Sequence, residues 1–290
     1  YVQEFHADII NITEENQLYK IELNRTYFYP EGGGQPSDNG FIDSSEIFDV
    51  QYENNHIIHF SKSKPSNLKN VVCKINWDNR FDLMQQHTGQ HILSAAFEKL
   101  FEANTVGFHL SNDYVTIDLD KRLTMVQVIS AENLSNEIIY NNLAVKTHYP
   151  NEKELDEMPL RKPPKVTADI RITEVTGFDF SPCGGTHVNF TGEIGIIKIK
   201  KIENHKDGIR VEFISGSRAL KDYQFKNELI YKLAIDLSVK PDEVEISYEK
   251  MKFEMTALKS EIKDLKEQLI DFKIQELVQQ AQSLNHVKII

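Results

Sequence analysis

The pattern of hydrophobic and polar positions divides the chain into three parts. In the first sixty residues, short runs alternate between apolar and polar side chains or are rich in β-branched and aromatic residues, which is typical of strands. The predicted strands cover residues 4–12, 17–23, 40–50 and 56–60. Several short strands of this kind pack well as a small barrel. We therefore predict an N-terminal β-barrel subdomain over residues 1–70.

Residues 71–216 mix helical and strand patterns, which predicts an α+β domain. Helices are expected over 78–103 and 124–142, and strands over 114–119, 144–149, 167–180, 193–202 and 208–215. In the first of these helices, histidine and apolar side chains recur at helical spacing, and Asp78 is a suitable N-cap.

Residues 217–290 are predicted to be helical and to form a coiled coil. Pro241 suits the first turn of the second helix in this segment. The apolar side chains that follow are spaced alternately four and three residues apart, which is a heptad seam. They are Val244, Tyr248, Met251, Met255, Leu258, Ile262, Leu265, Leu269 and Phe272. Such a seam mediates either a homodimer or a helix pair within one chain. We expect the segment to lead into a C-terminal domain that is mostly absent from this sequence.

Composition and charge restrict the possible partners. Two cysteines in 290 residues, a hydrophobic content of 40% and no long apolar run predict a cytoplasmic protein that does not span a membrane. The net charge of −11 argues against nucleic-acid binding by bulk electrostatics. However, the first sixty residues hold eleven acidic and two basic side chains. The rest of the chain is therefore nearly balanced, and local basic clusters remain available for RNA.

Two motifs supply side chains that bind metals. His87 and His91 lie four residues apart, so both imidazoles can reach one ion from the same face of a helix. Cys183 and His187 are the first and last residues of the sequence Cys-Gly-Gly-Thr-His. Its two glycines let the backbone fold closely around a ligand. Three imidazoles and one thiolate suit Zn²⁺ better than Mg²⁺ or Ca²⁺. Thr88 stands where a His-Glu-x-x-His metalloprotease has its catalytic glutamate, so that class is excluded.

Four stretches of the sequence together resemble the alanyl-tRNA editing proteins (AlaX family, long form) and the editing domain of alanyl-tRNA synthetase. They cover residues 24–40 with a Pro-Glu-Gly-Gly-Gly-Gln loop, 80–93 with the two histidines, 183–188, and 208–212. Their order and separation also match, and the resemblance extends over about residues 1–218. It implies that residues 71–216 have the fold known as the second additional domain of threonyl- and alanyl-tRNA synthetases.

The resemblance also implies a reaction, which is hydrolysis of the ester linking serine or glycine to tRNA(Ala). The zinc ion would be held by His87, His91 and Cys183, with either His187 or water as the fourth ligand. The threonine with which the family recognises the serine hydroxyl matches Thr26. From the residues alone, the better interpretation of Thr26 is a strand threonine with a satisfied hydroxyl group.

The glycine-rich loop of the family has its counterpart in this sequence. The matching residues are Gly32, Gly33, Gly34 and Gln35. Backbone N–H groups in such a loop can stabilise the negative charge that develops on an ester oxygen during hydrolysis.

A basic cluster after the Cys-His motif is a candidate tRNA contact, because cations that meet phosphates position a nucleic acid. Its members are Lys198, Lys200, Lys201, Lys206 and Arg210. The alternative is a solvated strand face, with Arg210 paired to Glu212 or Glu193.

Two other functions remain open from the sequence. The editing domain of threonyl-tRNA synthetase shares the same frame of His-x-x-x-His and Cys-x-x-x-His motifs. A zinc-stabilised tRNA-binding module without catalytic activity would use the same ligands.

Overall fold

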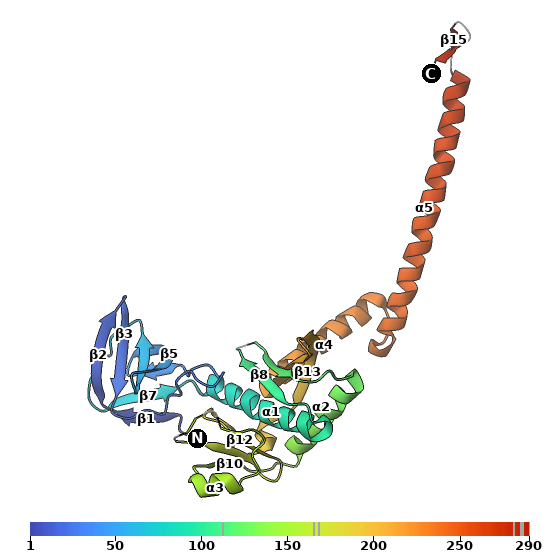
Figure 1. Cartoon of the computed structure of the whole chain (residues 1–290). Helices are drawn as coiled ribbons and strands as arrows, with labels where there is room; N and C mark the ends of the chain where they lie inside the picture. Colours follow the sequence, from blue (N-terminus) through green and yellow to red (C-terminus); the bar gives the residue numbers. More distant parts are fainter. Residues whose placement is uncertain (112, 165, 168, 281, 285–286, 290) are drawn as a thin grey trace. The chain divides into compact units, whose positions relative to one another are not determined.

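The computed structural model describes the whole chain except residues 112, 165, 168, 281, 285–286 and 290 (Figure 1). It comprises two compact units, Tyr1–Lys221 and Asp222–Ile290. The prediction of an α+β protein with antiparallel sheets and a long C-terminal helix is confirmed. The finer division at residues 70 and 216 stays a prediction. None of the described helices combines the length and low charge that a membrane span requires.

Seven antiparallel strands form the N-terminal sheet, in the order β1-β7-β4-β5-β6-β3-β2. Their bounds are β1 Glu4–Ala7, β2 Ile9–Glu15, β3 Leu18–Leu23, β4 Gly40–Ile42, β5 Ser45–Glu53, β6 His56–Ser61 and β7 Val71–Ile75. One face is packed into a core that includes Ile21, Ile42, Ile47 and Val50, all fully buried. The alternation of buried and exposed positions in these strands is the pattern from which they were predicted.

The predicted closed barrel is wrong, because β1 and β2 stand at opposite ends of the sheet order and do not pair within the described residues. Asp8 alone connects them in the chain, whereas a tight hairpin between antiparallel strands uses two loop residues. At this bend, the backbone groups of Asp8 and Ile9 form hydrogen bonds with residues outside β1 and β2. The Ile9 amide donates to the Leu68 carbonyl at 2.9 Å, and the Asn24 amide donates to the Asp8 carbonyl at 2.9 Å.

Helix α1 (Trp77–Phe101) is the central element of the rest of the first unit. Its N-cap is Asn76 rather than the predicted Asp78, and every residue from Leu83 to Phe97 is buried. It packs between a four-stranded sheet, a three-stranded sheet and helix α2 (Met125–Tyr140) (Figure 1). Because it is enclosed on all sides, its polar side chains need partners inside the protein.

The two sheets around α1 are antiparallel. The four-stranded sheet has the order β13-β14-β9-β8, with β8 Thr105–Leu110, β9 Val115–Leu119, β13 Ile197–His205 and β14 Gly208–Ser215. The three-stranded sheet consists of β10 Val145–His148, β11 Ile172–Val175 and β12 Asp179–Pro182. Short helices α3 (Glu152–Glu157) and η1 (Thr191–Ile194) complete this part. The strand predicted over 167–180 includes residue 168, which lies outside the described residues. The described part contains the hairpin of β11 and β12 instead of one strand, since Gly177 turns the chain with a φ of +71°.

Helix α4 (Gly216–Leu237) is followed by the short helix η2 (Pro241–Glu243) and the long helix α5 (Val244–Gln280). Pro241 opens this helical stretch as predicted. Short strands β15 (Gln282–Leu284) and β16 (Val287–Ile289) follow. Apart from the buried Val244, the seam side chains of α5 are exposed, which leaves an apolar stripe along the helix.

A buried histidine lies inside the N-terminal sheet. His59 is fully buried, and its Nδ1 lies 3.0 Å from the carbonyl oxygen of Ile21. A carbonyl only accepts hydrogen bonds, so Nδ1 carries the proton and Nε2 accepts. Nε2 lies 2.9 Å from Oγ1 of Thr26, whose hydroxyl therefore donates. Burial lowers the pKa of His59 to about 4, against an opposing effect of the Ile21 hydrogen bond.

Acidification should therefore destabilise the first unit through His59. The unfolded ring takes up a proton as the pH falls below about 6.5, whereas the folded ring stays neutral down to about pH 4. The difference corresponds to roughly 3 kcal/mol, present above pH 6.5 and lost on the way to pH 4. We expect urea unfolding to show a steeper fall in stability over this window for the wild type than for His59→Gln. Equal slopes in the two proteins would contradict the assignment.

Candidate metal centre

The four side chains predicted to bind a metal converge in the structure. His87 and His91 come from α1, and Cys183 and His187 from the loop that follows β12. One donor atom from each residue lies within 4.8 Å of all the others. The thiol Sγ of Cys183 is 3.3 Å from Nε2 of His87 and 3.3 Å from Nε2 of His187. A set of four converging N and S donors can hold one metal ion.

Each imidazole has a hydrogen-bond partner at its Nδ1 atom, on the side of the ring that faces away from the cluster. Gln35 Oε1 lies 2.7 Å from Nδ1 of His87. A carboxylate oxygen of Asp179 lies 3.1 Å from Nδ1 of His91, and Oγ1 of Thr88 lies 3.1 Å from Nδ1 of His187. The amide oxygen and the carboxylate only accept, so Nδ1 of His87 and of His91 donates. Their Nε2 atoms are left with a lone pair that faces the cluster, as metal ligation requires.

The loop that carries Cys183 is fixed to β11 by an arginine that the sequence did not single out. The amide of Cys183 donates to the carbonyl of Arg171 at 2.9 Å. In return, Nη1 of Arg171 donates to the carbonyls of Cys183 at 2.9 Å and Gly185 at 2.6 Å. Gly185 is buried directly against the His87 ring and Gln35, where a side chain would not fit. The loop can therefore approach α1 only with glycine at this position.

The surroundings of Cys183 and His187 favour the protonation states in which these two residues bind metals. Burial raises the pKa of the Cys183 thiol, but the three imidazoles lower it by more, so its pKa falls well below the usual value. Burial lowers the pKa of His187 to about 3, although the thiolate of Cys183 opposes this. A thiolate beside a neutral imidazole is the form in which both residues act as ligands.

The glycine loop lies against the cluster through Gln35. This side chain is buried and bridges the two motifs, since it accepts from His87 and from the Thr186 amide at 3.0 Å. Gly32 and Gln35 bond to each other through their backbones. The amides of Gly33 and Gly34 make no hydrogen bond within the described residues, and both residues have positive φ. They are the loop N–H groups available to a ligand.

Thr26 has a defined hydrogen-bond polarity, although no hydrogen bond joins it to the four donors within the described residues. Its hydroxyl donates to Nε2 of His59, and its oxygen accepts from the Phe28 amide at 3.1 Å. The oxygen retains one lone pair, so Thr26 can meet a ligand only as an acceptor.

Arg80 connects the loop of residues 24–39 to helix α1. Its guanidinium pairs with the fully buried Asp38, with Nε 2.7 Å from one carboxylate oxygen. It also donates to the Tyr27 carbonyl at 2.8 Å. A buried pair of this kind fixes the loop relative to the helix that carries His87 and His91, and removal of one partner would leave the other charge uncompensated.

The predicted basic cluster is largely neutralised by acidic side chains. Lys198 pairs with Glu132 at 2.6 Å, and Lys201 pairs with Glu203. Arg210 makes two hydrogen bonds to Asp118, of 2.6 and 2.9 Å. The sequence suggested Glu212 or Glu193 for Arg210, but the pairing of β14 with β9 places Asp118 directly opposite. Lys206 occupies the turn between β13 and β14. The tRNA contacts of this cluster, Lys200 included, stay a prediction.

Comparison with known proteins defines the class of this site. Residues 170–212 match the family model described as the threonyl and alanyl tRNA synthetase second additional domain. Residues 2–79 match the model for class II (A) tRNA synthetases. The first match contains Cys183 and His187, and the second contains the glycine loop. The chain thus carries both matched regions, residues 2–79 and residues 170–212.

The chain is similar to curated proteins along most of its length. It is 37% identical over 235 residues to the alanyl-tRNA editing protein AlaX-L of Pyrococcus horikoshii, which covers 76% of this chain and 57% of that protein. Alanine–tRNA ligase of Haloquadratum walsbyi is 33% identical over 256 residues, or 83% of this chain and 27% of the ligase. The ligase of Ignicoccus hospitalis is 29% identical over 309 residues, or 100% of this chain and 33% of the ligase.

These matches place the chain in the alanyl-tRNA editing family. It is a homologue of AlaX-L, and it spans little more than half the length of that relative.

The two glycines of the Cys-Gly-Gly-Thr-His loop allow a matched test of the metal centre. A Cβ on Gly185 would overlap the His87 ring and come within 2.8 Å of Gln35 Oε1, whereas a Cβ on Gly184 meets nothing within 4 Å. Gly185→Ala should therefore displace His87 and weaken Zn²⁺ binding roughly 10-fold or more. Gly184→Ala should bind as the wild type does. Chelator competition measures both, and equal affinities for the two variants would contradict the described packing.

Proposed function

We propose that this protein is a zinc-dependent hydrolase that deacylates Ser-tRNA(Ala) and, as a second substrate, Gly-tRNA(Ala). The observation that carries the proposal is the convergence of three supported imidazoles and a thiolate beside the glycine loop. The similarity to AlaX-L, which is named as an alanyl-tRNA editing protein, supports the choice of substrate.

The donor set favours Zn²⁺ as the metal. Borderline-soft imidazole and thiolate ligands suit zinc, and no carboxylate belongs to the described cluster. His87, His91 and Cys183 would hold the ion, with either His187 or water as the fourth ligand. When bound, such an ion supplies Lewis acidity that polarises an ester carbonyl or lowers the pKa of water.

The side chains and backbone of the chain supply the remaining requirements. Gln35 holds the His87 ring in place, and the amides of Gly33 and Gly34 donate to the negative charge that develops on the ester oxygen. Thr26 recognises the serine hydroxyl. Since Thr26 meets a ligand as an acceptor, the serine hydroxyl donates to it, and alanine has no group to offer. A site built for a hydroxyl can reject the analogue that lacks it by a large factor.

The decisive experiment measures release of amino acid from purified mischarged tRNA. We expect the wild type to release serine from Ser-tRNA(Ala) and to leave Ala-tRNA(Ala) intact, and His91→Ala to lose this activity. Hydrolysis of both substrates at equal rates, or of neither, would overturn the proposal. Faster hydrolysis of Ser-tRNA(Thr) than of Ser-tRNA(Ala) would assign the protein to the threonyl type of editing. Tight binding of tRNA(Ala) without any turnover would indicate a binding module.

Thr26 provides a test of substrate choice that leaves the metal centre intact. Thr26→Val removes the acceptor for the serine hydroxyl, so kcat/KM for Ser-tRNA(Ala) should fall roughly 10- to 100-fold, as expected for one buried hydrogen bond. The value for Gly-tRNA(Ala) should change little, because glycine has no hydroxyl. Thr26→Ser keeps the hydroxyl and serves as the control. A parallel loss with both substrates would show that Thr26 does not discriminate between them.

We further propose that the seam of α5 joins two copies of the chain in the cytoplasm. Its apolar side chains are exposed, as Leu258, Ile262 and Leu265 illustrate at 57%, 52% and 54%. An exposed stripe of this size favours pairing with another helix. Light scattering should give a dimer for the wild type and a monomer for Leu265→Asp. Ser260→Asp places the same charge away from the seam and should stay dimeric. A wild-type monomer would favour pairing within one chain.

A further inference from the structure

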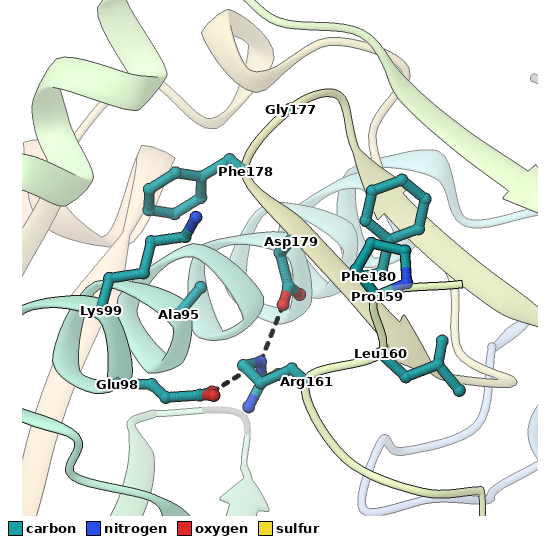
Figure 2. Close-up of a pocket in the computed structure, with 10 residues that line it drawn as sticks. All are labelled: Ala95, Glu98, Lys99, Pro159, Leu160, Arg161, Gly177, Phe178, Asp179 and Phe180. Atoms are coloured by element: carbon teal, nitrogen blue, oxygen red, sulfur yellow. Dashed lines mark hydrogen bonds and ion pairs between the residues drawn. The ribbon is translucent and has the colours of Figure 1, made fainter. Parts of the chain in front are cut away.

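A line of charged groups leads from His91 away from the metal cluster to a separate cavity of about 510 Å³. The cavity is lined by the end of α1, the segment 159–161 and the hairpin between β11 and β12 (Figure 2). Figure 2 shows Arg161 beside it, between the carboxylates of Asp179 and Glu98. None of the four metal-binding residues lines this cavity.

Asp179 differs from the other two groups that support the imidazoles. Gln35 and Thr88 are neutral, whereas Asp179 is a carboxylate whose side chain is only 1% exposed. One oxygen accepts from His91 at 3.1 Å, and Ser181 Oγ donates to the same oxygen at 2.9 Å. The other oxygen lies 2.8 Å from Nε of Arg161. A carboxylate removed from water to this extent needs a counter-charge, and Arg161 is the cation that provides it.

The position of Arg161 is fixed by its backbone as well as by its side chain. Its amide donates to the Phe180 carbonyl at 2.8 Å, which attaches the segment 159–161 to β12. The side chain is 8% exposed, and Nε is 3.9 Å from Glu98. Its Nη2 atom is buried without a hydrogen-bond partner within the described residues. The backbone hydrogen bond to Phe180 and the side-chain bond to Asp179 together hold the guanidinium against the carboxylate that supports His91.

We propose that Arg161 is a positioning residue for the metal centre, which acts through Asp179 to hold His91 with Nδ1 protonated and Nε2 directed at the ion. The inference concerns the ligand set of the proposed hydrolase, and its consequence is measured on the protein without substrate. Outer partners of metal-binding histidines typically change metal affinity by about 10- to 100-fold when they are removed. Arg161 contacts Asp179 and not the histidine itself, so its removal should reduce the metal affinity by an amount at the lower end of that range.

The test compares three variants in chelator competition for Zn²⁺. Arg161→Met should weaken binding about 10-fold, although it touches no ligand. Arg161→Lys should recover part of the loss, because lysine restores the charge but not the planar geometry. Glu98→Gln is the control. The Glu98 side chain is 34% exposed and its carboxylate is 3.9 Å from Nε of Arg161, so this substitution should change the affinity for Zn²⁺ by no more than about twofold. Zinc affinity of Arg161→Met within twofold of the wild type would overturn the proposal.

A double variant separates positioning from a general effect on folding. In Asp179→Asn the carboxylate is gone, so adding Arg161→Met should cause no further loss of Zn²⁺ affinity. Additive losses would contradict the proposed route through Asp179. If Arg161→Met does not fold, Arg161→Lys takes its place. Its zinc affinity is then compared in the wild-type background and in the Asp179→Asn background by the same measurement.

The metal-free protein gives a second readout that does not depend on hydrolysis. Nitrogen chemical shifts report which imidazole nitrogen of His91 carries the proton. The wild type should show Nδ1 protonated, and Arg161→Met should show a mixture of the two tautomers, whereas His87 should not change. An unchanged His91 spectrum would overturn the inference even in an active enzyme. If the wild type had no deacylase activity but Arg161→Met still lost the tautomer preference of His91, the inference about Arg161 would hold and the proposed function would fail.

Discussion

An imidazole that offers Nε2 to a metal must carry its proton on Nδ1, and a buried N–H group must have an acceptor. This constraint acts at the metal centre and organises the first unit of the protein. His87 takes its acceptor from the glycine loop of the N-terminal sheet, and His91 takes its acceptor from β12. His187 is supported by Thr88 on α1 itself. The candidate metal centre therefore depends on three segments that are distant in the sequence: the glycine loop, α1 and β12.

The same constraint explains the unusual composition of α1. A helix buried on all sides is normally apolar, yet this one buries a run of glutamine, histidine and threonine side chains. Gln85 donates to the carbonyl of Glu193 at 2.8 Å, and Gln86 exchanges hydrogen bonds with the backbone of Ser215. The helix thus positions η1 and the end of β14 by hydrogen bonding as well as by packing. A polar core of this kind specifies one arrangement, because each mismatch leaves a buried group unsatisfied.

Features set by local spacing could be predicted from the sequence. The i, i+4 pair of His87 and His91 needs only a helix, and the Cys183 motif needs only a tight glycine loop. The four side chains could therefore be proposed as one group, and the structure brings them together. Their supporting residues could not be found in this way. Gln35 is 52 residues from His87, and Asp179 is 88 residues from His91, so no periodicity connects them. The alternative pairing of Arg210 with Glu212 or Glu193 is not the one in the structure, because the partner of Arg210 depends on the register of β14 against β9. The closed barrel failed for a similar reason, since the one-residue connection at Asp8 determines the outcome.

The open sheet gives a purpose to the acidic side chains of the N-terminal region. Because β1 and β2 do not pair, β2 remains an edge strand with backbone groups that another chain could use for pairing. The second half of this strand carries Glu14 and Glu15, both exposed, and the opposite edge carries Glu4. Charged side chains on an edge oppose strand addition by a second molecule. Three of the acidic side chains of the first sixty residues therefore lie where they disfavour edge-to-edge pairing.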